Sequence, residues 1–381
     1  MARRRWHVPG RGNRGLSVTP ADAWLDAAEA TVSLGARELC CLLNGNTSGF
    51  ARAADALKRA GGVSVCPEKL REVVEAEGRR VLEAKESAAL LPGWAACDCK
   101  VKTPRGREVS RVYLGADGFM APLVTDAEKR ARRKKVVAAR RRRPLSRPKL
   151  PPLRGRRRGA DQRYKEFKAV LFYDQDLGRR LVSVTRGDGA EAGRVMRRDA
   201  AQVGFAAADE RVGNIDGGPW ILNQIRRRSM PMTAVGLDFY HLAENVHRCS
   251  RLTFGEADAT GLDWTARTLH AAKHRGHAAL SRRLSDWRGR WRSAAKRKEA
   301  DRLMNYVSDR REMIDYPRFL ANGWRIGSGP TESQCRVVPA RVKGPGKRWD
   351  ADNAEAVMAL EAVHQSHQWR PYWTTCAPNN D

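Results

Sequence analysis

The chain has 381 residues, with 72 Lys or Arg against 43 Asp or Glu, so its formal net charge is +29. This length suggests two or three domains, and a hydrophobic content of 41% is enough for packed cores. So large a positive charge attracts phosphate backbones, which makes nucleic acid the leading class of partner. A basic protein of the membrane surface is the weaker alternative, because no basic amphipathic helix with an aromatic face stands out.

The sequence also indicates the compartment. No apolar run approaches the roughly 18 residues that cross a bilayer, and the basic start, MARRRWHVPGRGNRG, lacks the apolar segment of a signal peptide. Eight scattered cysteines favour free or buried thiols over disulfides. We therefore expect a cytoplasmic protein with no membrane partner, associated with the nucleoid if it binds DNA.

Helical patterns dominate the first hundred residues. Residues 1–18 are predicted to be a mobile basic arm, and an apolar helical pattern begins at Thr19. Within the helical region 19–100, the segments FARAADALKRAGG and VSVCPEKLREVVEAEGRRVLEAKE predict two helices joined by a glycine turn. Such a pair can form a helix-turn-helix in which Lys69 and Arg71 face DNA. An ordinary helical hairpin is the alternative, because glutamates interrupt the basic face.

After residue 101 the period changes to that of strands. REVSRVYLGADGFM is predicted to be a strand ending at Asp117, and YKEFKAVLFYDQD and RRLVSVT are the next two strands. A helix, the strand ERVGNIDGG ending at Asp216, a second helix from PWILNQIRRR and the strand MTAVGLDFYH ending near Asp238 follow. This order predicts a mixed α/β sheet.

A basic segment, residues 125–160, would interrupt that sheet between its first two strands. It holds 16 Lys or Arg and two acids, a net charge of +14 and about half of the whole chain's excess. We predict a loop that is disordered when free and contacts phosphates. A merely solvated run of charge is the alternative.

The last third is predicted to be helical over 240–325 and again near the end of 326–370, before a tail of 371–381. Between these helices lies the stretch GSGPTESQCRVVPARVKGPGKRW, in which the single acid Glu332 stands at the head of a basic run. We expect its cations to hold phosphates; they are Arg336, Arg341, Lys343, Lys347 and Arg348.

Three acids could form a metal site. Asp117 and Asp216 each close a hydrophobic strand before a glycine, a pattern that most often marks only a turn. In an RNase H-like strand order, however, the first and fourth strands lie side by side, and a third carboxylate from a later helix joins them. Hard oxygen ligands suit Mg²⁺ or Mn²⁺. Two such ions, about 3.5–4 Å apart, would activate a water or a 3′-hydroxyl.

Several blocks carry a family resemblance: VYLGADGFMAP, YKEFKAVLFYD, NIDGGPWI, LDFYHLAENV and IGSGPTESQCRVVPARVKGPGKRW. They resemble successive blocks of bacterial insertion-sequence transposases of the DDE type, most closely the ISKra-type group related to mutator-like transposases. The resemblance covers residues 20–365 and is specific from Asp117 onward. It implies an RNase H-like domain that cuts double-stranded DNA at transposon ends, joins the ends to target DNA, and works as a homodimer or larger assembly.

The resemblance also implies roles for individual residues. Asp117, Asp216 and Glu332 would be the catalytic metal ligands, and Asp238 and His241 match the (C/D)xxH signature near the active site. Residues 240–325 would be a helical insertion into a catalytic core made of 101–239 and 326–370. The N-terminal region is only loosely matched, and the basic segment is unusually rich in arginine.

Structural alternatives stand beside these roles. Glu332 could be a capping acid four residues after Ser328, one more than a capping box needs. Asp238 could be an N-cap, His241 a satisfied structural histidine, and Trp349 a core residue rather than a platform for a flipped base. Two other functions remain open: a catalytically silent or domesticated DNA-binding regulator, and an RNase H-type nuclease that cuts RNA–DNA hybrids.

Overall fold

The computed structural model describes residues 31–144, 147–148, 150–227 and 230–376, together with the backbone of 6–8 and 16–18. The predicted helix start at Thr19 and the residues after 376 lie outside the described parts. Within the predicted basic arm, β1 (Trp6–Val8) and β2 (Leu16–Val18) pair antiparallel. None of the described helices combines the length and the apolarity that a membrane span requires.

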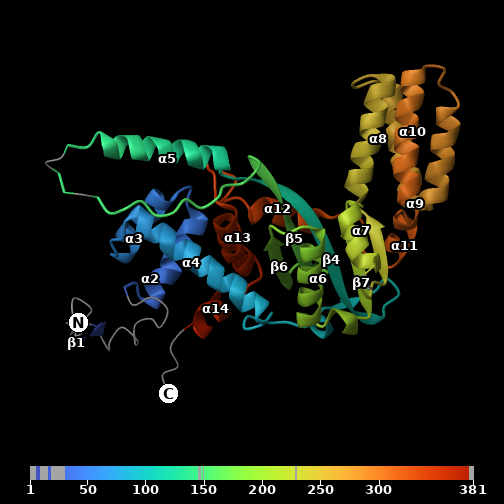
Figure 1. Cartoon of the computed structure of the whole chain (residues 1–381). Helices are drawn as coiled ribbons and strands as arrows, with labels where there is room; N and C mark the ends of the chain where they lie inside the picture. Colours follow the sequence, from blue (N-terminus) through green and yellow to red (C-terminus); the bar gives the residue numbers. More distant parts are fainter. Residues whose placement is uncertain are drawn as a thin grey trace. The chain divides into compact units, whose positions relative to one another are not determined.

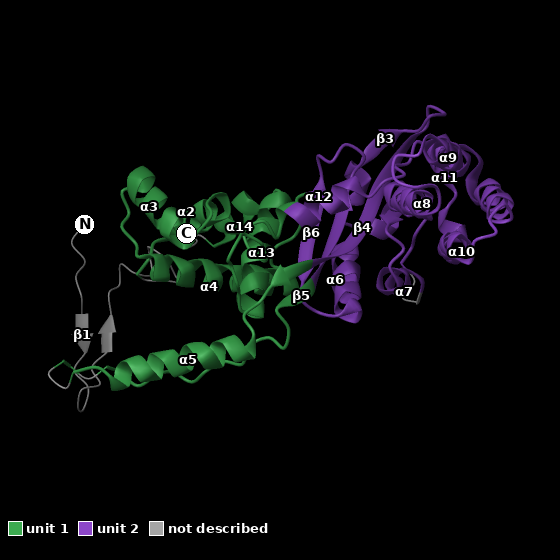
Figure 2. Cartoon of the chain, turned by 90° about the horizontal axis from the view of Figure 1, so that it is seen from above, with its two compact units in different colours: residues 1–93, 120–166, 337–381 green, residues 94–119, 167–336 purple. Residues whose placement is uncertain are grey.

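The chain forms two compact units, coloured separately in Figure 2. Unit 1 comprises residues 1–93, 120–166 and 337–381, and unit 2 comprises residues 94–119 and 167–336. Each unit therefore gathers segments that are far apart in the sequence.

A mixed sheet forms the centre of unit 2, in the order β6-β5-β4-β7-β8 with β3 beside β4. Its strands are β3 (Lys100–Lys102), β4 (Glu108–Pro122), β5 (Tyr164–Tyr173), β6 (Arg180–Thr185), β7 (Glu210–Ile215) and β8 (Ala234–Leu237). β5 pairs antiparallel with β6, whereas β4, β7 and β8 run parallel. The predicted mixed α/β sheet is confirmed, and the first and fourth strands, counted from β4, are neighbours.

The middle of β4 is buried without interruption from Val109 to Ala116. A strand that is buried at consecutive residues is covered on both faces. Val112 and Leu114 belong to one hydrophobic core with Val195 and Met196 of α6 (Gly189–Gln202). This packing holds the strands in place, and with them the polar side chains that the strands carry.

Four α-helices lie between β8 and residue 325: α8 (Phe239–Phe254), α9 (Ala259–Arg288), α10 (Ala294–Asp309) and α11 (Tyr316–Ala321). The helical pattern predicted for 240–325 is therefore present, and α8, α9 and α10 lie side by side (Figure 1). Their buried side chains join the core of the sheet.

α9 is not straight. At Gly276 the backbone has φ +72°, a left-handed value that glycine adopts without strain. Arg283 Nε donates to Thr268 Oγ1 at 3.0 Å, and the ring centroids of Trp264 and Trp287 are 4.3 Å apart. Residues 15 positions apart on a straight helix would be about 22 Å apart. The two halves of α9 therefore fold back on each other.

Unit 1 is helical: α2 (Leu34–Asn46), α3 (Phe50–Gly61), α4 (Pro67–Glu86), α13 (Ala351–Gln365) and α14 (Trp369–Thr375). The predicted pair of helices around a glycine turn is present as α3 and α4, with Gly62 in the left-handed region. α4 and α13 cross so closely that a Cβ added to Gly78 would lie 2.1 Å from the Ala356 carbonyl oxygen. Only glycine permits this approach.

The prediction that residues 125–160 form a disordered loop is wrong for their first half, which is the helix α5 (Asp126–Arg141). Thr125 and Glu128 form a capping box, and cations occupy the last turn, as the helix dipole prefers. No residue of α5 is buried. Composition alone suggested disorder, whereas the capping signal at Thr125 decides the local structure.

The chain after α5 runs back along this helix. Lys129, Arg133 and Arg140 donate side-chain hydrogen bonds to backbone carbonyls of that returning segment, those of Arg158, Arg154 and Pro151. The basic side chains therefore satisfy backbone acceptors that no sheet or helix partner covers.

Candidate functional site

Asp117 lies within β4 rather than at its end, because the strand continues to Pro122. The predicted strand end at Asp117 is therefore wrong. The carboxylate is half-buried, and Oδ1 accepts from the N–H of Gly118 at 2.6 Å. Burial raises the pKa of Asp117, and the negative charge of Asp216 adds to the rise. Two carboxylates therefore act on each other at this point of the sheet.

Asp216 follows the last residue of β7. In the parallel pairing of β4 and β7, Leu114 lies opposite Gly213, and Asp117 and Asp216 each come three residues later. This equal offset puts the two acids at the same level of neighbouring strands. The positive φ of Gly217 (+77°) turns the chain, and Gly218 N–H donates to Asp216 Oδ1 at 2.7 Å.

Glu332 lies on α12 (Gly329–Val337), which rests on β4 at Gly115. A Cβ added to Gly115 would lie 1.9 Å from Thr331 Oγ1, so the helix approaches where β4 has no side chain. Cys335, one turn after Glu332, donates its thiol hydrogen to the Asp117 carboxylate. The face of α12 that carries Glu332 is thereby turned toward the carboxylates of the sheet.

A compact cluster forms beside these acids from Asp238, His241 and Glu332, whose ligand atoms lie within 4.8 Å of one another. His241 Nδ1 is 2.5 Å from Asp238 Oδ2 and 4.0 Å from Glu332 Oε1. Ser328 Oγ donates to Glu332 Oε1 at 2.8 Å. This set resembles a metal-binding group in its residue types, since carboxylate oxygens and an imidazole nitrogen are common ligands.

Asp238 is fully buried and has two roles. It is the N-cap of α8, accepting from the N–H groups of Tyr240 and His241, and it also accepts from Ser328 N–H at 3.1 Å. Burial alone would raise the pKa of Asp238, but the hydrogen bond with His241 and those from Ser328 and Tyr240 lower it overall. The N-cap alternative is thus confirmed without removing Asp238 from the site.

His241 is held in a charged state. Its hydrogen bond with Asp238 raises its pKa to about 9 against the opposing effect of burial, and the charges of Asp238, Asp216 and Glu244 contribute. The charge of Asp216 contributes to the raised pKa of His241, and the charge of His241 in turn lowers the pKa of Asp117. Among the described residues, Asp238, His241 and Glu332 meet through close contacts, whereas Asp117 and Asp216 are not part of this group and interact with it through charge.

One contributor was not predicted from the sequence, Cys335, and Ser328 was predicted only as a possible N-cap before Glu332. Both lie near Glu332 along the chain, at spacings of four and three residues, which place them one helical turn away. This spacing could have identified both residues in the sequence as neighbours of Glu332. Their hydrogen bonds to Glu332 and Asp117 fix the two acids that were predicted from motif alone.

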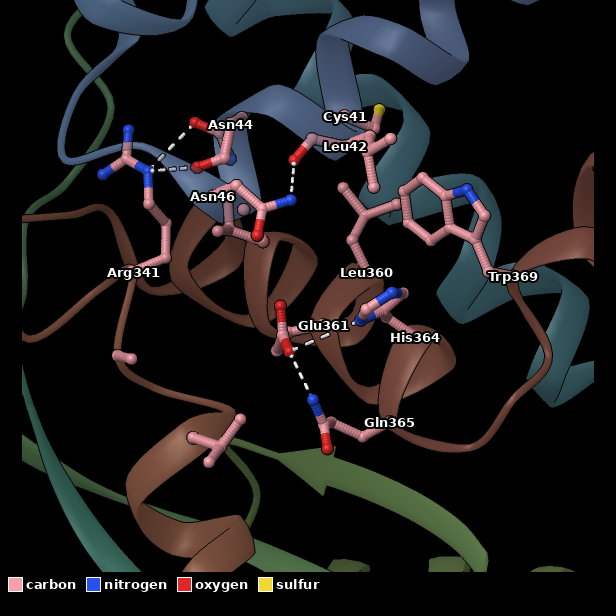
Figure 3. A pocket seen from close by; sticks show the side chains of 14 residues that line it. Cys41, Leu42, Asn44, Asn46, Arg341, Leu360, Glu361, His364, Gln365 and Trp369 are labelled. Carbon is pink, nitrogen blue, oxygen red and sulfur yellow. Dashed lines mark hydrogen bonds and ion pairs between the residues drawn. The ribbon is translucent and has the colours of Figure 1, made fainter.

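The predicted phosphate-binding cations differ in exposure. Arg336, Lys343 and Arg71 are exposed, and Lys69 is half-buried. Arg341 is only 7% exposed, so the prediction of a solvent-facing phosphate contact is wrong for this residue. Its Nε donates to the backbone and side-chain oxygens of Asn44 at 3.0 Å (Figure 3).

Arg341 also lies over the rings of Phe50 and Trp349, at 4.7 and 5.4 Å from their centroids. Trp349 is itself buried, and its indole N–H donates to the Val342 carbonyl. The core role for Trp349 is therefore confirmed over the role of a stacking platform.

Several predicted cations meet in a cavity of about 440 Å³ within unit 1. Arg71 of α4 and the later residues Lys347 and Arg348 line it, together with Lys129 and Arg132 of α5. Lys347 Nζ donates to the Arg341 carbonyl, and Arg348 pairs with Glu128 at 2.8 Å. The fold thus brings together cations that are far apart in the sequence.

No protein-family model matches this chain, and no curated protein matches it significantly.

Proposed function

We propose that the chain is a DNA transposase of the DDE type, which cuts DNA at transposon ends and transfers the strands into target DNA. The observation that carries this proposal is that Asp117 and Asp216 come the same number of residues after a paired position of the neighbouring parallel strands β4 and β7. Glu332 lies on α12, which rests on β4. Three carboxylates from separate elements suit phosphoryl transfer without a covalent nucleophile.

The order β6-β5-β4-β7-β8 supports an RNase H-like core, since in chain order from β4 it reads 3-2-1-4-5. In this proposal β4 and β7 are the central strands that carry the acids. The helices from α8 to α11 then form the insertion between the second Asp and the Glu.

The donor set fits divalent cations such as Mg²⁺ or Mn²⁺. Asp117 and Asp216 repel each other, which contributes to the raised pKa of Asp117, and a bound cation would remove this repulsion. Asp117, Asp216 and Glu332 would hold one or two ions, with Asp238 and His241 beside them. When bound, the ions would activate an attacking water or 3′-hydroxyl and stabilise the leaving oxygen.

The protein's own residues would position the DNA. His241 is 35% exposed and carries a positive charge at neutral pH, so it would attract a phosphate next to Glu332. Asp238 fixes the ring of His241, and Cys335 fixes Asp117. The exposed cations Arg336, Lys343 and Arg71 would contact the backbone of end or target DNA, with two protomers joining the two ends.

One observation favours a second candidate, a catalytically silent DNA-binding regulator. Glu332 Oε1 accepts from Ser328 and lies close to His241, so this carboxylate has protein partners other than a metal ion. Such a protein would keep the basic surfaces and the DNA affinity while lacking cleavage.

The test is cleavage of supercoiled plasmid and of end-containing DNA by the wild type, by Asp216→Asn and by a control, Asp176→Asn. Asp176 is an exposed acid in the turn between β5 and β6, so its substitution makes the same chemical change away from the site. We expect Mg²⁺-dependent cleavage that Asp216→Asn reduces by about 100-fold or more, with DNA binding in EDTA unchanged in all three proteins.

Full cleavage by Asp216→Asn would contradict the proposed metal role of this residue. Wild-type protein that binds DNA but never cuts it in Mg²⁺ or Mn²⁺ would favour the regulator.

A further inference from the structure

The fold-back of α9 creates a cavity of about 460 Å³ in unit 2. Arg275 and Ala279 line it near the bend at Gly276, and Arg282, Arg283 and Arg290 line it further along the chain. Trp264 and Trp287, from the two halves of α9, also line the cavity. None of these residues belongs to the carboxylate site.

The charges of the cavity are strongly unbalanced. Four arginines face a single acid, Asp286. Arg275, Arg282 and Arg290 are exposed, and among the described residues their side chains have no hydrogen bond or ion pair. Burial and the neighbouring charges of Arg267, Arg275 and Arg290 lower the pKa of Arg283, against the opposing charge of Asp263. Cations therefore outnumber acids around this cavity, and their mutual repulsion is only partly offset.

The hydrogen-bonding groups of the cavity are mostly donors. A guanidinium group offers up to five N–H donors and no acceptor. A ligand rich in acceptor oxygens would satisfy such a lining, and phosphate is the group that arginine forks fit best.

We propose that this arginine-lined cavity binds backbone phosphates of DNA, at a site separate from the carboxylates. The cavity, at about 460 Å³, is larger than a single phosphate needs. The charge of +29 over the whole chain favours a polyanion over a small anion. The choice of DNA rests on the proposed function, but the binding needs neither the metal nor cleavage.

The test measures DNA affinity of the full chain in EDTA over a series of KCl concentrations. The variant Arg275→Gln/Arg282→Gln/Arg290→Gln removes the three arginines that lack protein partners. For three lost contacts to duplex phosphates, the slope of log K against log[KCl] should become less negative by about 2.7.

The matched control removes three exposed arginines that do have acid partners: Arg59→Gln/Arg194→Gln/Arg226→Gln. These pair with Asp55, Glu191 and Glu312. The net charge of the control changes by the same amount as that of the cavity variant. Because its arginines are paired with acids rather than with phosphates, the control should keep a slope close to that of the wild type. If the cavity variant unfolds in a thermal scan, the single variant Arg282→Gln should still change the slope by about 0.9.

Equal slopes for the cavity variant and the control would overturn the proposal. Binding of poly-glutamate that the cavity substitutions abolish, while the DNA slope stays that of the wild type, would also overturn it, because that result would assign the cavity to acidic proteins. Loss of cleavage with this salt dependence intact would contradict the proposed function and leave the cavity's role standing.

Discussion

At the scale of single residues, the site depends on the absence of one side chain. Gly115 is where α12 meets β4, and Thr331 Oγ1 occupies the space that a Cβ would need. Because Glu332 follows Thr331, any displacement of the helix moves the carboxylate as well. Thr331 Oγ1 is buried and has no hydrogen-bond partner among the residues that the structure describes, so its function is one of fit rather than of bonding.

We therefore expect Gly115→Ala to push α12 away from β4 and to destabilise the protein by about 1–3 kcal/mol, the usual cost of overpacking. Adding Thr331→Ala should restore much of that stability, because it removes Oγ1 and leaves only Cβ, 3.1 Å from the new methyl group. Thermal or urea unfolding of the single and double variants measures both effects.

Gly329→Ala is the control, since nothing lies within 4 Å of a Cβ at that position on the same helix. An equal loss of stability for Gly115→Ala and for this control would show that the contact with Thr331 has no consequence.

The residue types of the site were visible in the sequence, but their partners were not. An Asp near the end of a hydrophobic strand, followed by glycine, located Asp117 and Asp216. The close approach at Gly115 depends on how a helix more than 200 residues later in the chain returns to the strand, which no local pattern encodes. The burial of Arg341 was hidden for a similar reason, because a cation in a basic run resembles a surface residue until its aromatic neighbours are known.

At the scale of elements, the pairing of β4 with β7 is fixed at its start by a clamp of hydrogen bonds. The N–H and Oγ of Ser110 both donate to Asp209 Oδ2 at 2.8 Å, and Asp209 N–H donates to Ser110 Oγ at 2.9 Å. The next pair in the register is Arg111 and Glu210, which also form an ion pair at 2.6 Å. The clamp therefore helps to set the register that brings Asp117 and Asp216 to the same level.

The clamp predicts a pH dependence. Hydrogen bonds from Ser110 lower the pKa of Asp209 below 3.8, so the stabilisation is complete above that pH and is lost as pH falls through the folded-state pKa. Asp209→Asn should lower the melting temperature by about 1–3 °C at pH 7. The difference from wild type should shrink as the pH approaches 3.8 and below.

Thermal scans from pH 7 to about pH 2.5, which includes the range below 3.8 where the carboxylate takes up its proton, measure this difference. Asp176→Asn serves as a second acid-to-amide change in an exposed turn. A gap between Asp209→Asn and wild type that stays constant over the whole range would contradict the role of the charged carboxylate.

Helices and strands could be predicted from the sequence where the spacing of apolar residues distinguishes the two. The strands of the sheet and their order along the chain follow from alternating or continuous hydrophobic runs, as in Val112, Tyr113 and Leu114. α5 has no such signal, because none of its residues is buried. Its capping box is present in the sequence as Thr125 and Glu128, but the prediction rested on the high charge and the prolines that follow.

At the scale of the whole molecule, charge and burial are distributed very unequally. Residues 125–160 carry about half of the net charge, and α5 within them buries nothing. Isolated helices of about this length are marginal in water. Since its cations repel one another, α5 depends on its cap, on side-chain bonds to the returning segment, and on the ion pairs of Lys129 with Asp350 and of Glu128 with Arg348.

We therefore expect the amides of α5 to exchange with solvent much faster than those of α13, whose residues from Ala356 to Leu360 are all buried. Duplex DNA should slow exchange in α5 by about tenfold or more, because phosphates neutralise the repulsion and bind only the formed helix well. Raising the KCl concentration should remove this protection together with the bound DNA, while exchange in α13 stays the same. Hydrogen exchange followed by mass spectrometry resolves both helices in one experiment. Protection of α5 equal to that of α13 in the free protein, or no response to saturating DNA, would show that this basic helix is a structural element rather than a DNA contact.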